Sequence, residues 1–111
     1  MERRKQLDRT NLLVLSLLNS GDMYGYQMII ELERRSSGVF KMKEGTLYPI
    51  LHGLENTGAL RSYQKEAETG RMRKYYHITE AGKRQLDRET EAWTEYAEAI
   101  EGVLGTARGL A

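Results

Sequence analysis

The sequence predicts a mainly α-helical fold with a two-stranded β-hairpin, because three patterns follow one another along its 111 residues. Apolar residues recur at helical spacing in short segments before residue 56. Residues 60–67 and 72–79 alternate between apolar and polar on either side of a polar turn. From residue 80 on, apolar residues repeat every seven positions, as in a long helix that pairs with another. Together these patterns predict a winged helix-turn-helix followed by a long C-terminal helix.

The composition limits the chain to one modest domain without cysteine chemistry. A hydrophobic fraction of 40% over 111 residues is enough for a single core. The absence of cysteine excludes a disulfide framework and any cysteine nucleophile or metal ligand. No apolar run of about 20 residues follows the polar start, so we expect a soluble, cytoplasmic protein with no membrane partner.

Charge is distributed unevenly along the chain, although the formal net charge is only +1. Residues 1–79 contain thirteen Lys or Arg against nine Asp or Glu, whereas residues 80–111 contain four against seven. A basic first part and an acidic last part indicate a polyanionic partner for the first part alone, and double-stranded DNA is the partner we expect.

Two helices are predicted before the central segment. Residues 7–19 are so rich in leucine that we expect this helix to be covered on two sides. Residues 19–22 form a helix stop and a turn. The second helix covers residues 23–32, with Tyr24 or Asp22 at its start. The residues expected on its buried face are Met28, Ile29 and Leu32.

The segment from Gly45 to Leu54 is predicted to be the recognition helix. Gly45, Pro49 and Gly53 recur every four residues opposite its apolar face, so this side has almost no side-chain bulk. Such a face can approach another backbone closely, which suits the major groove of DNA. The alternative is a helix packed beneath another helix of the same fold. The residues expected to contact base edges are Thr46, Tyr48, Pro49 and His52.

Pro49 leaves two possible starts for this helix. A start near Lys43 places the proline inside the helix, where it removes a hydrogen bond to the Gly45 carbonyl and crowds that group. A start nearer Gly45 places Pro49 in the first turn and avoids the conflict. The sequence leaves both starts open.

The hairpin that follows is predicted to be the wing. In its second strand Tyr76 and Ile78 alternate with Tyr75 and His77, so one pair can face the helices and the other can face outward. Cations gather near its tip, where they would reach phosphates beside the groove. The alternative is an edge strand whose charges discourage aggregation. The expected phosphate contacts are Lys43, Tyr24, Lys65, Arg71, Arg73 and Lys74.

The last element is predicted to be a long dimerisation helix. Thr79 is a suitable N-cap, and the repeat of apolar residues has no core of its own left to fill. The expected dimer-interface residues are Leu86, Trp93, Ala97, Ile100 and Leu104. The alternative is a helix that folds back onto the first helix, and both arrangements can hold together. We accordingly divide the chain into a DNA-binding domain at 1–79 and a C-terminal helix at 80–111, frayed after about Leu104.

Several motifs also resemble the PadR transcriptional regulators. They are Leu12-Leu13-Val14-Leu15, Tyr24-Gly25-Tyr26, Gly45-Thr46-Leu47-Tyr48-Pro49-Ile50-Leu51, Leu54-Glu55 with Gly58, Arg73-Lys74-Tyr75-Tyr76 and Thr79-Glu80-Ala81-Gly82. The resemblance covers residues 7–86 and implies a dimeric winged helix that represses promoters at inverted repeats and is released by a small effector. The single C-terminal helix resembles the short subfamily. Met72 stands where many members have proline, which predicts a looser wing turn.

An effector site is expected at Trp93, which is similar to the tryptophan that lines a ligand pore in the multidrug-responsive branch of that family. Glu89 and Ala97 lie one turn away on the same helix, and Leu12 would come from the first helix. These residues suit a planar aromatic molecule, cationic or neutral. The alternative is a tryptophan that only packs in the interface.

The sequence contains no pattern typical of an enzyme. His52 and His77 have no cysteine, second histidine or carboxylate cluster at metal-ligand spacing, so we expect no metal and no cofactor. No phosphate-binding loop or nucleophile elbow is present. Two functions remain: a ligand-responsive DNA-binding repressor, and a winged-helix adaptor that binds protein independently of DNA.

Overall fold

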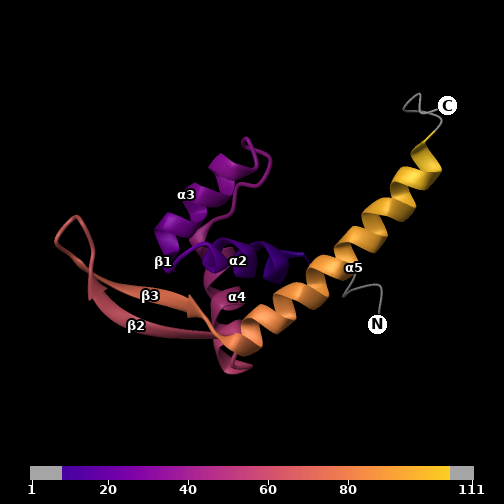
Figure 1. The fold of residues 1–111 in the computed structure, drawn as a ribbon. Helices are drawn as coiled ribbons and strands as arrows, with labels where there is room; N and C mark the ends of the chain where they lie inside the picture. The colour runs from indigo at the N-terminus through magenta and orange to yellow at the C-terminus, as the bar shows by residue number, and fades with distance from the viewer. Residues whose placement is uncertain (1–8, 106–111) are drawn as a thin grey trace.

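The computed structural model describes residues 9–105 as a bundle of short helices with a β-sheet on one side and one long helix (Figure 1). The elements are α2 (Thr10–Asn19), β1 (Met23–Tyr24), α3 (Gly25–Arg35), α4 (Glu44–Asn56), β2 (Leu60–Glu66), β3 (Met72–Ile78) and α5 (Glu80–Leu104). The expected helix start at Leu7 and the fraying beyond residue 105 lie outside the described residues. The predicted fold class, a winged helix-turn-helix with a long C-terminal helix, is confirmed.

The core lies where α2, α3 and α4 meet the sheet. Leu15 of α2 and Leu51 of α4 have no exposed surface, and Tyr76 of β3 is almost as deeply buried. Helix α2 contacts α3, α4, α5 and β3, so its leucine-rich sequence is covered on more than one side, as its composition predicts. This packing fixes the recognition helix α4 relative to the hairpin.

The sheet has three antiparallel strands in the order β1-β3-β2, one more than the sequence predicts. Met23 pairs with Tyr76 and Tyr24 with Tyr75. Of the two predicted starts of the second helix, Tyr24 is confirmed as its N-cap, whereas Met23, which was expected to be helical, lies in the strand. Helix α3 begins at Gly25 with Tyr24 as its N-cap, and the Tyr24 N–H donates to the side chain of Gln27 at 3.1 Å. Strand β1 thus ties the start of α3 to the wing.

Helix α4 begins at Glu44, with Lys43 as its N-cap, so Pro49 lies inside the helix as its sixth residue. Of the two possible starts, the structure has the earlier one, near Lys43. The residue four positions before the proline is Gly45, and no atom lies within 4 Å of where its Cβ would be. An open glycine backbone can adjust to the proline ring, which lowers the cost of the clash between the ring and the Gly45 carbonyl.

The end of α4 is a tight glycine turn that also receives the start of α5. Gly58 has φ +86°, and the Ala59 N–H donates to the Leu54 carbonyl at 2.9 Å. Thr79 is the N-cap of α5, as predicted: its Oγ1 accepts from the Gly82 N–H at 3.1 Å and donates to the Gly58 carbonyl at 2.6 Å. One threonine therefore joins the two helix ends.

The first turns of α5 belong to the core of their own chain. Leu86, which the seven-residue repeat assigns to the dimer seam, is only 9% exposed and joins the core cluster. This corrects the expected role of Leu86, because α2 packs on this part of α5 and fills the first position of the repeat. The C-terminal half of α5 projects beyond the other described elements (Figure 1). Within residues 9–105, no helix is long and apolar enough to cross a membrane.

Candidate nucleic-acid interface and effector groove

The exposed side of α4 is a narrow ridge without bulky side chains. Thr46, Pro49 and His52 are exposed, as a contact with bases requires. At Gly45 and Gly53 no described atom lies within 4 Å of where a Cβ would be. Another helix of the described chain does not cover the ridge, so it is open to a partner. This openness favours a groove-binding helix over the alternative of a helix packed beneath another helix.

Tyr48 differs from the other expected base contacts because it is half-buried against α3. A Cβ at Gly25 would lie only 2.5 Å from the Tyr48 hydroxyl oxygen, so the phenol rests on the bare backbone of α3. A larger residue at this position would push the Tyr48 ring away from α3. Tyr48 therefore sets the spacing between α3 and α4 and lies beside the exposed ridge.

The outer face of the sheet carries three stacked tyrosines and two cations. Tyr75 lies under Tyr24, in an edge-on contact with centroids 5.3 Å apart, and beside Tyr63, with stacked rings 5.8 Å apart. Lys65 and Arg73 are directly opposite each other in the hairpin. The Lys65 ammonium lies 5.0 Å from the Tyr75 ring and the Arg73 guanidinium 5.3 Å from the Tyr24 ring. Cation–π contacts thus place Lys65 beside Tyr75 and Arg73 beside Tyr24.

Lys74 lies on the opposite face of the hairpin, because successive strand residues alternate. Its ammonium is 3.9 Å from the carboxylate of Glu55 in α4, which also accepts a 2.7 Å hydrogen bond from Ser62. Lys65, Arg73 and Lys74 are therefore neighbours in the hairpin, as expected, but Lys74 lies on the other face from Lys65 and Arg73. Glu55 instead joins the recognition helix to both strands of the wing.

The wing turn is closed and well defined. The Gly70 N–H donates to the Ala67 carbonyl and the Ala67 N–H to the Arg71 carbonyl, both at 2.8 Å. Gly70 has φ +88°, which supplies the left-handed residue of a bulged hairpin turn. These two hydrogen bonds close the turn before Met72, and the looser turn expected from Met72 stays a prediction. Arg71 is exposed at the end of this turn.

A side-chain cluster that the sequence analysis missed anchors the base of the wing. The Asp22 carboxylate accepts a 2.6 Å hydrogen bond from the Tyr63 hydroxyl and lies 2.9 Å from Nδ1 of His77. Burial alone would raise the pKa of the Asp22 carboxyl. The hydrogen bonds from Tyr63 and His77 outweigh it and leave this pKa below its ordinary value of 3.8. Three segments of the chain meet at one carboxylate.

We expect acid to loosen this anchor. Because the pKa of Asp22 is lower in the folded chain, its stabilising contribution is complete above the unfolded pKa of about 4 and is lost as the pH falls through the folded-state pKa. Asp22→Asn should unfold at a lower temperature than the wild type at pH 6, and the difference should narrow as the pH falls below about 4. Circular dichroism melts across this range measure the gap, and a gap that stays constant would contradict the role of Asp22.

An apolar stripe on α5 is left uncovered by the described chain. Its members are between 39% and 81% exposed: Trp93, Tyr96, Ile100, Val103 and Leu104. Ala97, another expected interface residue, is half-buried beside them. A contiguous apolar surface of this kind on a soluble protein is typical of a protein–protein interface.

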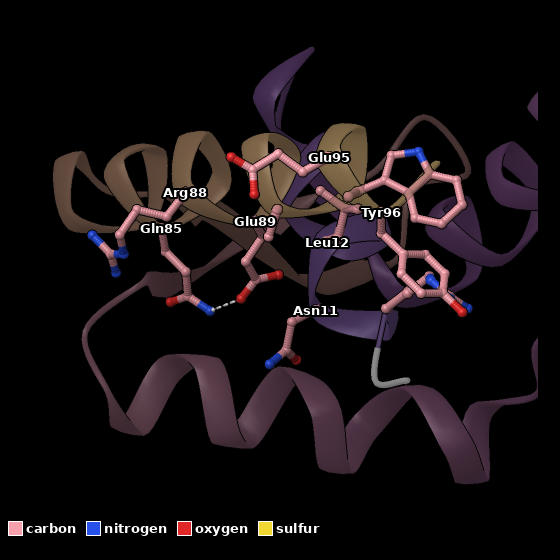
Figure 2. Close-up of a pocket in the computed structure, with 10 residues that line it drawn as sticks. Asn11, Leu12, Gln85, Arg88, Glu89, Glu95 and Tyr96 are labelled. Carbon is pink, nitrogen blue, oxygen red and sulfur yellow. Dashed lines mark hydrogen bonds between the residues drawn. The ribbon is translucent and has the colours of Figure 1, made fainter. Parts of the chain in front are cut away.

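A groove of about 760 Å³ separates the start of α2 from the middle of α5 (Figure 2). Its lining residues are Arg9, Asn11, Leu12, Gln85, Arg88, Glu89, Ala92, Trp93, Glu95 and Tyr96. The structure thus brings together three of the four expected effector residues, Leu12, Glu89 and Trp93, whereas Ala97 does not line the groove. The side-chain amide of Gln85 donates a 2.8 Å hydrogen bond to the Glu89 carboxylate, and Asn11 and Leu12 of α2 face these two residues (Figure 2). Within the described residues, no group of side chains could hold a metal ion.

The comparisons with known proteins agree on one family. Residues 14–88 match the transcriptional regulator PadR-like family. Over 100 residues, the chain is 33% identical to a transcriptional regulator from Mycobacterium tuberculosis, and the match covers 90% of each protein. A transcriptional regulator from Clostridium thermocellum has a similar structure, with a TM-score of 0.77 and 29% identity over 92% of this chain and 97% of that one. A PadR family transcription regulator from Clostridium difficile has a TM-score of 0.73 and 30% identity, covering 86% and 98% respectively.

Proposed function

The chain belongs to the PadR-like family of transcriptional regulators, and from this premise we propose that it is a ligand-responsive repressor that binds an inverted-repeat operator as a homodimer. The observation that carries the proposal is the open ridge of α4 beside a basic wing, on the same chain as an uncovered apolar stripe. A ridge without bulk suits the major groove, and the stripe suits a second copy. DNA binding is assigned to residues 1–79 and dimerisation to residues 80–111.

The proposed base contacts come from the exposed ridge of α4. Thr46, Pro49 and His52 would lie against base edges, with Tyr48 at the border of the contact. None of them can make the paired hydrogen bonds by which arginine reads guanine, so apolar contact with thymine methyl groups should dominate. Specificity should then be moderate and should depend partly on DNA shape.

The proposed phosphate contacts flank this ridge. Lys43 is exposed at the start of α4, and Arg71 is exposed at the wing tip. Tyr24, Lys65 and Arg73 share the outer face of the sheet, where the tyrosine rings hold the two cations in fixed positions. Held cations lose less freedom on binding a phosphate. The half-sites of a two-fold dimer should be about one helical turn apart, roughly 34–36 Å.

The proposed effector is a planar aromatic molecule bound in the groove between α2 and α5. Trp93 offers a flat wall there, and Glu89 and Glu95 offer negative charge. The dimer can bind the operator only when its two recognition helices have the right spacing. Such a molecule relieves repression only if it binds more tightly to the dimer conformation with the wrong spacing than to the one with the right spacing. Its site lies on the two helices that would set this spacing.

Selection of random genomic DNA fragments on the purified protein tests the DNA-binding part. We expect the retained fragments to share an inverted repeat, and footprinting should protect both halves. Affinity should fall steeply as salt increases, because phosphate contacts release counterions. Fragments without a shared sequence, bound with no salt dependence, would instead favour the protein-binding adaptor.

We expect Arg73→Ala to weaken binding to all DNA sequences and to reduce the salt slope by about one unit, because a single phosphate contact is lost. Lys74→Ala is the matched control, since it removes the same charge from the other face, where Glu55 already partly neutralises it. Its effect should be smaller. Binding titrations at several salt concentrations measure both slopes. A change in the preferred sequence for Arg73→Ala would instead mean that Arg73 contacts a base.

A further inference from the structure

The flat cation of Arg9 already occupies the place that a planar ligand would take. Trp93 and Tyr96, which we call the aromatic slot, have ring centroids 6.0 Å apart and planes inclined by 43°. The Arg9 guanidinium carbon lies 4.9 Å from the Trp93 ring and 5.2 Å from the Tyr96 ring. One planar, delocalised cation is therefore shared between both rings of the slot.

The backbone of Arg9 is fixed, whereas its side chain is held mainly by the rings. Arg9 is the residue before α2, and its carbonyl accepts from the Leu13 N–H at 3.1 Å, which fixes its main chain. Its Nε is buried yet has no hydrogen-bond partner among the described residues. A buried donor without a partner costs free energy, which offsets part of the gain from stacking. The side chain can therefore be displaced without breaking a hydrogen bond at Nε.

The other charges of the groove favour a cation in this position. Within residues 9–105, the charged residues that line the groove are Arg9, Arg88, Glu89 and Glu95. If Arg9 leaves the slot, two carboxylates face one arginine, and the groove has an excess of negative charge. An incoming flat cation restores the balance and can cover more of both rings than a guanidinium covers.

We propose that Arg9 is an intramolecular competitor for the aromatic slot, so that a planar cationic ligand must displace its guanidinium from Trp93 and Tyr96 in order to bind. The proposal rests on the effector part of the proposed function and adds how that site is regulated. Arg9 sets a threshold: small or weakly stacking cations do not displace it, whereas extended aromatic cations do. Its removal should tighten binding without any new contact.

Two measurements on the purified full-length chain test the proposal. The first is acrylamide quenching of Trp93, the only tryptophan of the chain, in the absence of ligand. Arg9→Gln should uncover the indole and raise the quenching slope. The second is the affinity for proflavine, a planar tricyclic cation, which should become about fivefold tighter in Arg9→Gln, the equivalent of ~1 kcal/mol at 1.4 kcal/mol per tenfold. Arg88→Gln is the control, since it removes an equal charge from the same groove, and Arg88 contacts no aromatic ring among the described residues.

The outcomes separate this proposal from the function on which it rests. An unchanged quenching slope in Arg9→Gln would overturn the proposal, because the guanidinium would not cover Trp93 in solution. Proflavine binding that tightens equally in Arg9→Gln and Arg88→Gln, or in neither, would overturn the competition and leave the effector site standing. If no variant binds proflavine, the competition and the planar-cation effector both fail, while operator binding is judged by its own experiment.

Discussion

Replacing Gly82 by alanine should lower the free energy of unfolding by about 2–3 kcal/mol, near the upper end of the usual cost of overpacking. A Cβ at this position would overlap the carbonyl oxygen of Ala59 and lie 2.8 Å from Cγ1 of Ile78. The Ala59 carbonyl cannot easily move away, since it accepts hydrogen bonds from both the N–H and the hydroxyl of Thr79 at 3.0 Å. The start of α5 would have to shift from the end of α4.

Gly102→Ala is the matched control in the same helix. No atom lies within 4 Å of where its Cβ would be, so alanine should stabilise α5 by about 0.5–1 kcal/mol. Gly102 is nine residues beyond Trp93, which places it half a turn around the helix from the apolar stripe. Urea unfolding at one protein concentration gives both values. Equal stabilities of the two variants would show that Gly82 is not tightly enclosed.

Ile100→Asp should convert the proposed dimer into monomers that keep their helix content. A carboxylate in an apolar seam loses its hydration without gaining a partner, which a dimer interface cannot easily accommodate. Operator affinity should fall by a factor on the order of 100 or more, because each half-site is then bound without the other. Light scattering and operator titration measure the two effects.

Thr94→Asp is the matched control for this change. It adds the same carboxylate to an exposed position of α5, but one residue and about 100° around the helix from Trp93. This variant should remain dimeric and bind the operator as the wild type does. If Ile100→Asp also remains dimeric with native helix content, the stripe is not the interface, and a different surface must join the two chains.

The periodic patterns of the sequence predicted most helices and strands. The element that they did not predict depends on contacts between residues far apart in the chain. The apolar spacing of α4, the alternation of β3 and the cap at Thr79 are local signals, and the structure has those elements there. Strand β1 has only two residues, too few for any alternation to appear, and it exists because β3 pairs with it. Pairing with β3 therefore determined the conformation of Met23 and Tyr24, although the residues that follow them have a helical pattern.

The same distinction applies to the candidate site. The exposure of Pro49 and His52 could be predicted, because the spacing of apolar residues along a sequence shows which side of a helix is buried. The half-burial of Tyr48 depends on Gly25 of another helix, and the place of Leu86 depends on how α2 packs. The stacking of Arg9 on Trp93 joins residues 84 positions apart, so no local pattern could indicate it.

The unbroken length of α5 makes it a lever between the two proposed sites. Its 25 residues contain no proline, and one end is fixed to the turn after α4 while the other carries the apolar stripe. A helix of this length is about 37 Å long. Trp93 lies thirteen residues beyond Glu80, about 20 Å along the helix. A 10° change in the angle at which two such helices cross at Trp93 would therefore move the ends near α4 by about 3.5 Å, close to one base-pair step of 3.4 Å. A small molecule bound where the two α5 helices cross would therefore need to rotate them only slightly to move the recognition helices out of register with the operator.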